Sequence, residues 1–119
     1  MASTIPNRFR NVSVSNTALL VAAGSKVIVG WNLINTNSTS CFLKIYNAAT
    51  AGAVIVGTTV PIATLMIPAA GLFFLSNEDK FQVGLNLGIV VAVTTGIADT
   101  DNTAPVTGCL VEISYANNN

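Results

Sequence analysis

Short runs of β-branched and aromatic residues, separated by clusters of Gly, Asn, Ser and Pro, recur along almost the whole chain. The clearest run is Lys26–Asn35, in which every second residue from Val27 to Leu33 is large and apolar. Such alternation places these side chains on one face of a strand. Because the bulkiest of them is Trp31, we expect Trp31 in the core. No stretch has the spacing of an amphipathic helix.

About eight such runs, spaced as strands are in all-β domains, can be recognised. Strands without intervening helices predict an antiparallel β-sandwich, two sheets packed face to face with jelly-roll or Greek-key connections. The 119 residues are expected to form a single domain, residues 1–119. Its ends are expected to be an N-terminal arm, about residues 1–10, and a frayed C-terminal tail, residues 116–119.

Two neighbouring strands are predicted to pair. The run Lys26–Asn35 is followed by the loop Thr36–Ser40 and then by a strand that starts at Cys41. A loop this short between alternating runs is typical of a β-hairpin. Further on, the segment Pro61–Pro68 is bounded by two prolines, which cannot donate to a strand ladder, so it belongs at a sheet edge.

Charge is scarce. Charged residues make up 8% of the chain, against about 25% in an ordinary globular domain. Five Lys and Arg balance five Asp and Glu, so no region offers the basic field that a nucleic acid requires. A protein with little net charge associates readily. We therefore expect a surface that is covered by neighbours, first of all by copies of the same chain.

Uncharged stretches, residues 45–77 and 81–98, are as long as a membrane span, but Pro, Gly and polar residues interrupt both. We expect no membrane partner. The N-terminus lacks the pattern of a secretory signal, so the chain is expected to fold where it is made. Cys41 and Cys109 are then expected to be buried free thiols, although a disulfide between them is an alternative.

Catalytic chemistry finds little support. The chain has no histidine, the commonest general base and a common metal ligand. Neither cysteine could be activated by an imidazole, and we expect no enzyme activity and no cofactor. Asp99 and Asp101 alternate as oxygen ligands do in a calcium loop, but the glycine and glutamate of an EF-hand are missing. The default expectation is that they form a turn without a metal. The alternative is a looser calcium site made by Asp99, Asp101 and backbone carbonyls.

A resemblance rests on four stretches: GWNLINTNSTSCFLKIYNAATAG, PIATLMIPAAG, GIVVAVTTGIADTDNTAP and VEISYANN. Their order resembles small virion proteins of tailed bacteriophages, of the capsid decoration or cement type. The resemblance implies a β-sandwich that forms a homotrimer on the capsid exterior, made in the host cytoplasm. It implies a partner, the major capsid protein, whose assembled lattice the subunit stabilises, and no cofactor.

Candidate interface residues follow from this hypothesis. Phe73, Phe74 and Leu75 are consecutive and bulky, so they cannot all face inward on one strand; the alternative is a strand buried on both faces. The N-terminal arm could reach a neighbour, with Arg8 and Arg10 pairing with acidic groups of the capsid. The alternative is a disordered tail. The predicted interface residues are Arg8, Phe9, Arg10, Phe73, Phe74 and Leu75.

A second function hypothesis is a fibre or tail-associated binding module. In this interpretation the loops Asn35–Ser40 and Ile97–Pro105 recognise a glycan or a host receptor. Sugar sites usually present exposed aromatic side chains, whereas aromatic residues make up 7% of this chain and its single Trp is expected inside. The structural role is therefore the preferred hypothesis.

Overall fold

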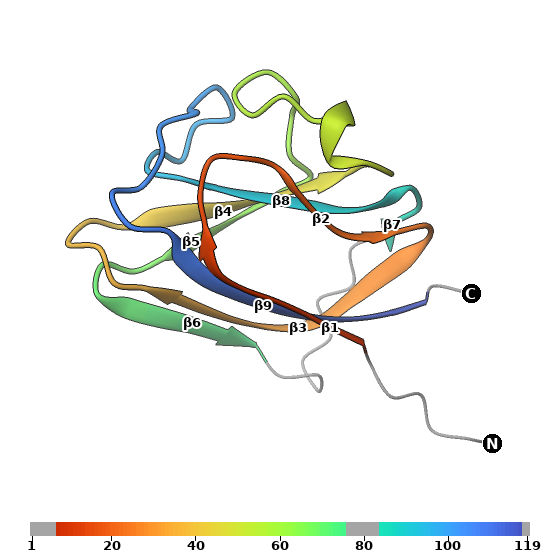
Figure 1. Ribbon diagram of the computed structural model, residues 1–119, viewed down its shortest axis with the longest axis horizontal. Helices are drawn as coiled ribbons and strands as arrows, with labels where there is room; N and C mark the ends of the chain where they lie inside the picture. The colour runs from red at the N-terminus through yellow and green to blue at the C-terminus, as the bar shows by residue number, and fades with distance from the viewer. Residues whose placement is uncertain (1–6, 76–83, 118–119) are drawn as a thin grey trace.

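The protein is all-β in the computed structural model, which describes residues 7–75 and 84–117 (Figure 1). Every strand pairing in these residues is antiparallel. The strands are β1 (Asn7–Val14), β2 (Leu19–Ala23), β3 (Lys26–Asn35), β4 (Cys41–Asn47), β5 (Ala63–Ile67), β6 (Gly71–Leu75), β7 (Gly84–Leu85), β8 (Gly88–Thr94) and β9 (Cys109–Asn117), with a 3₁₀ helix, η1, at Ala51–Ala53.

The strands form two sheets. Sheet A has the order β1-β9-β3-β6, with β7 also paired to β3, and sheet B has the order β2-β8-β4-β5. The pairings are nested: β1 lies beside β9, β2 beside β8, β3 beside β6 and β4 beside β5. A long antiparallel hairpin that is rolled into two sheets has this order, which is the jelly roll. The predicted β-sandwich is confirmed.

The core lies between the two sheets and is filled by alternate residues of each strand. In β3 the inward side chains are Ile28, Trp31 and Leu33, because the pairing with β9 shifts register between Ile28 and Gly30. Trp31 is 5% exposed and its ring meets that of Phe73 edge to face, with centroids 5.4 Å apart. The predicted core position of Trp31 is confirmed. The predicted inward face is wrong before the register shift, because Ile28 points into the core in place of Val27 and Val29.

The predicted hairpin between β3 and β4 is wrong. β3 belongs to sheet A and β4 to sheet B, so residues 36–40 cross from one sheet to the other. Leu33 and Leu43 both point into the core, from opposite sides. Alternation in two neighbouring strands shows that each has a buried face but not that the strands pair. A connection of five residues is long enough to cross from one sheet to the other, and it is also long enough to close a hairpin, so its length does not decide between the two.

Both predicted chain ends need correction. Asn7 to Arg10, assigned to an N-terminal arm, form the first half of β1 and pair with β9. At the other end, Ala116 and Asn117, assigned to a frayed tail, pair with the start of β3. Packing of Phe9 on the core holds β1 in place. Residues 1–6 and 118–119 lie outside the described part.

The prolines around β5 have the predicted consequence. β5 pairs with β4 on one side and is an outer strand of sheet B. Ile62, next to Pro61, still donates its backbone N–H to the Ile45 carbonyl at 2.7 Å. The edge assignment of Pro61–Pro68 is confirmed.

Candidate interaction surface

The outward side of sheet A is partly exposed among the described residues. Leu33, Phe73 and Val111 point into the core, so their neighbours along each strand point outward. We call this outward side the open face; its side chains are those of Arg8, Arg10, Val12, Asn32, Ile34, Leu72, Leu110, Glu112 and Ser114.

A polar row crosses three strands of the open face. Arg10 on β1 and Asn32 on β3 lie on either side of Glu112 on β9. The Arg10 Nε donates to Glu112 Oε2 at 2.8 Å, and the Asn32 Nδ2 donates to Glu112 Oε1 at 3.1 Å. The hydrogen bond from Asn32 is the strongest influence on Glu112 and lowers its pKa; burial opposes it, and Arg10 and Arg8 add to the lowering. The Glu112 carboxylate in this row is therefore ionised at neutral pH and fixed by two side-chain hydrogen bonds.

An apolar row runs beside the polar one. Ile34 on β3 lies opposite Leu72 on β6 and Leu110 on β9. Val12 continues the row on the irregular part of β1, and Val12 and Leu72 are 58% and 60% exposed. Beside Leu72 the turn at residues 68–71 leaves a shallow hollow of about 350 Å³, lined by Ile34, Asn35, Thr36, Ala70, Gly71 and Leu72. Neighbouring apolar side chains next to paired ions are typical of protein contact surfaces.

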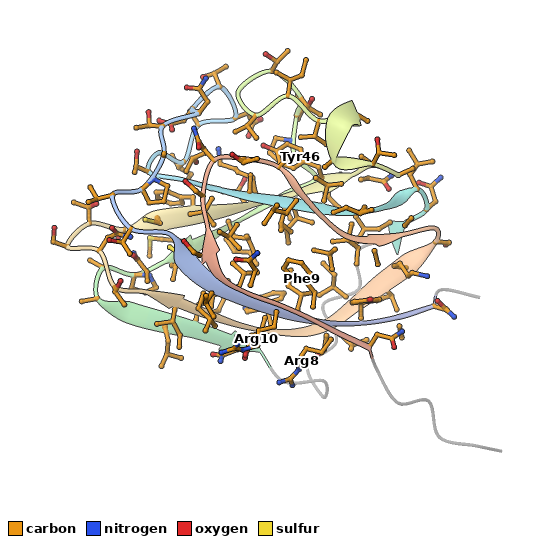
Figure 2. The ribbon with its side chains drawn as sticks, in the orientation of Figure 1. Arg8, Phe9, Arg10 and Tyr46 are labelled. Carbon is orange, nitrogen blue, oxygen red and sulfur yellow. The ribbon has the colours of Figure 1, made fainter. Side chains whose placement is uncertain are left out.

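The three predicted interface residues on strand β1 do not all point to the same side of sheet A. Arg8 and Arg10 point away from the sandwich, whereas Phe9 points into the space between the sheets and packs on the core (Figure 2). The alternation follows from pairing with β9, which places Arg8 opposite Ser114 and Arg10 opposite Glu112. The structure thus brings two of these residues to the open face.

The predicted interface residues on strand β6 are Phe73, Phe74 and Leu75. Phe73 lies against Trp31 and the core. The neighbouring Leu72 is 60% exposed, so the alternative of a strand buried on both faces is wrong at Leu72. Phe74 is opposite Asn32 in the register, and Leu75 is opposite Trp31. The side chains of Phe74 and Leu75 lie outside the described part of the structure.

Sequence reasoning missed Leu72, Ile34, Leu110 and Glu112, the partner of Arg10. A usable signal was present in the last strand, where Leu110, Glu112 and Ser114 alternate with the apolar Val111 and Ile113. The same alternation does not reveal which strands become neighbours, and therefore not that these side chains form one surface.

The outward side of sheet B has the opposite character, and we call it the covered face. Residues 48–62 and 95–104 arch over it (Figure 1). Tyr46, Val90 and Ala92 are buried there in a second small core. Ala18, Ala48, Val54 and Val56 pack onto them from the connections.

A buried lysine anchors one of these connections. Lys44 is fully buried, and its Nζ donates to the Ala98 carbonyl at 2.7 Å. The same carbonyl accepts the backbone N–H of Asp101 at 3.0 Å. Nearby, the Tyr46 hydroxyl is buried with no hydrogen-bond partner among the described residues. Burial, and secondly the charge of Asp99, raise the pKa of Tyr46.

The Asp99–Asp101 loop forms a turn. Asp101 Oδ1 accepts the backbone N–H of Thr103 at 2.9 Å, the pattern of an Asx turn. Across the described residues, no group of three or more His, Cys, Asp or Glu side chains is placed to hold a metal ion. The described residues also contain no helix that is long and apolar enough to cross a membrane.

At one end of the sandwich, amides and thiols form a buried cluster. Asn37 Oδ1 accepts the backbone N–H of Thr107 at 2.8 Å, and Asn37 Nδ2 donates to the Thr107 carbonyl at 2.7 Å. Asn35 Nδ2 donates to the carbonyls of Thr39, Ile67 and Pro68. These two side-chain amides are therefore used inside the molecule. We call Asn35, Asn37, Cys41, Cys109 and Thr107 the end cluster.

Comparison of the chain with models of protein families, with curated proteins and with solved structures gives no significant match.

Proposed function

We propose that the chain is a non-enzymatic structural protein of a virion, a decoration or cement subunit that binds the exterior of an assembled capsid. One observation carries the proposal: sheet B is covered by the chain itself, whereas the open face of sheet A exposes an apolar row beside a held ion pair. The partners are copies of the chain, as a homotrimer, and the major capsid protein.

The physical role requires only modest contacts per copy. A subunit that binds the assembled lattice and not the free capsid protein stabilises the lattice by mass action. Burying the exposed parts of Val12 and Leu72 against a neighbour contributes on the order of 1 kcal/mol each. Many copies, each joined through a trimer, multiply such small contributions. Low charge is consistent with this role because few ionic groups must be desolvated.

The binding-module hypothesis receives less support. The amides of Asn35 and Asn37, which would serve a glycan site in the first loop, are used by internal hydrogen bonds. The loop Ile97–Pro105 is held by Lys44, and the Asn102 carbonyl accepts the Asn16 amide at 2.9 Å. These loops support the sandwich more than they present a binding site.

Locating the protein in particles tests the proposal. Virus particles purified from the cells that make the chain are labelled with an antibody against it and viewed by electron microscopy. We expect label over the capsid shell, at a constant copy number per particle by quantitative mass spectrometry. Label confined to fibres or tails would favour the binding module, and absence from purified particles would refute both virion roles.

A further inference from the structure

The two cysteines come from different sheets and meet at the end cluster. Cys41 is the first residue of β4 in sheet B, and Cys109 is the first residue of β9 in sheet A. Both are free thiols and both are fully buried. Two strands that are not hydrogen-bonded to each other thus begin with thiols at the same end of the sandwich.

The thiols share an acceptor. Asn35 Oδ1 lies 3.7 Å from Cys41 Sγ and 3.8 Å from Cys109 Sγ. Burial raises the pKa of the Cys109 thiol to about 12, and the adjacent Cys41 adds to the increase through its charge and a thiol–thiol hydrogen bond. The shared acceptor and the thiol–thiol hydrogen bond indicate that the two sulfurs are direct neighbours.

We propose that Cys41 and Cys109 are a dithiol that oxidises to a disulfide joining the two sheets. With a disulfide oxidant such as oxidised glutathione, one cysteine sulfur attacks the oxidant and releases one glutathione. The second cysteine sulfur then displaces the other glutathione. Two thiol protons and two electrons pass to the two glutathione molecules, which leave as thiols.

The surroundings accept this bond without leaving a buried polar group unpaired. When the two S–H donors are lost, Asn35 Oδ1 still accepts the backbone N–H of Asn37 at 2.9 Å and its Nδ2 at 2.8 Å. The disulfide would close the long loop from residue 41 to residue 109, and long loops restrict the unfolded chain most. Oxidation therefore favours the folded sandwich.

Access limits the rate of this reaction. Because the thiolate is the reactive form, a buried thiol with a raised pKa reacts only when the end of the sandwich opens. The pair is then reduced in a reducing cytoplasm and closes slowly in oxidising surroundings. This switch does not depend on the virion role proposed above.

Equilibrium exchange tests the inference without depending on that rate. The full-length chain is unfolded and reduced, and is then refolded in buffers of oxidised and reduced glutathione. Because the folded thiols are buried, they are trapped with excess iodoacetamide added together with concentrated urea, and the products are analysed by peptide mass spectrometry. The same equilibrium is measured in concentrated urea. The native buffer is expected to favour the intramolecular disulfide roughly a hundredfold over urea, with a higher melting temperature for the oxidised protein.

Two variants serve as controls. Cys109→Ala and Cys41→Ala each keep one thiol, and their melting temperatures should not respond to the glutathione ratio. Equal disulfide formation in native buffer and urea, or an oxidised protein that melts below the reduced one, would overturn the proposal. Glutathione adducts or intermolecular disulfides in place of the internal bond would overturn it as well.

Discussion

The two outer sides of the sandwich have similar alternation but opposite surroundings. Outward side chains of the central strands β4 and β8, such as Lys44 and Tyr46, are buried, whereas those of β3 and β9, such as Asn32 and Leu110, remain partly exposed. The difference comes from the connections, because residues 48–62 and 95–104 fold over sheet B (Figure 1). The chain covers one outer side itself, whereas the other side stays partly exposed among the described residues.

The largest expected effect is on the covered face. Tyr46→Ala removes a fully buried ring from the second core and is expected to lower the free energy of unfolding by about 3–5 kcal/mol. Urea denaturation at neutral pH measures it. Tyr46→Phe removes only the unpaired hydroxyl and should be neutral or stabilising. A small loss for Tyr46→Ala would contradict the view that this face is a true core.

Two variants of Lys44 separate the stability that comes from packing of its aliphatic side chain from the stability that comes from its charge. Lys44→Ala leaves a cavity and is expected to cost about 2–4 kcal/mol. Lys44→Met preserves the volume, and Ala98 retains the hydrogen bond from Asp101, so this variant should change stability by less than ~1 kcal/mol. Urea unfolding compares the two. Equal losses would show that the ammonium–carbonyl bond, and not the stem, holds the loop.

On the open face, acid should weaken the polar row. The pKa of Glu112 is lowered from 4.5 in the folded protein, chiefly by Asn32. Its stabilisation is therefore complete above pH 4.5 and is lost as the pH falls through the lower folded value. The stability advantage of the natural chain over Glu112→Gln, measured by urea unfolding, should shrink between neutral pH and strong acid. An advantage that grew in acid would contradict this sign.

The smallest effect on stability is expected from the apolar row. The double variant Val12→Ser, Leu72→Ser should change the free energy of unfolding by less than ~1 kcal/mol, because both side chains are already more than half exposed. Under the proposed function it should nevertheless reduce self-association, measured by sedimentation velocity. Val106→Ser is the matched control, since Val106 is 99% exposed and belongs to the connection between β8 and β9, not to a strand of sheet A. Unchanged association of the double variant would exclude the apolar row as the subunit contact.

Much of the fold could be predicted from local patterns. Alternation around Trp31 placed it in the core, and the prolines at 61 and 68 identified an outer strand. The site was less predictable. Arg8 and Arg10 reach the open face as part of a strand and not as an arm, and Phe9 between them points inward.

By itself, the sequence determined that the chain forms strands, because β-branched runs with a period of two and frequent turn residues suit no other regular structure. Tertiary structure alone decided which strands pair and which outer side is covered. In the sequence, the strand face with Lys44 and Tyr46 looks as exposed as the strand face with Asn32 and Ile34. A period of two distinguishes the faces of a strand, but distant segments, here residues 48–62 and 95–104, decide which face meets water.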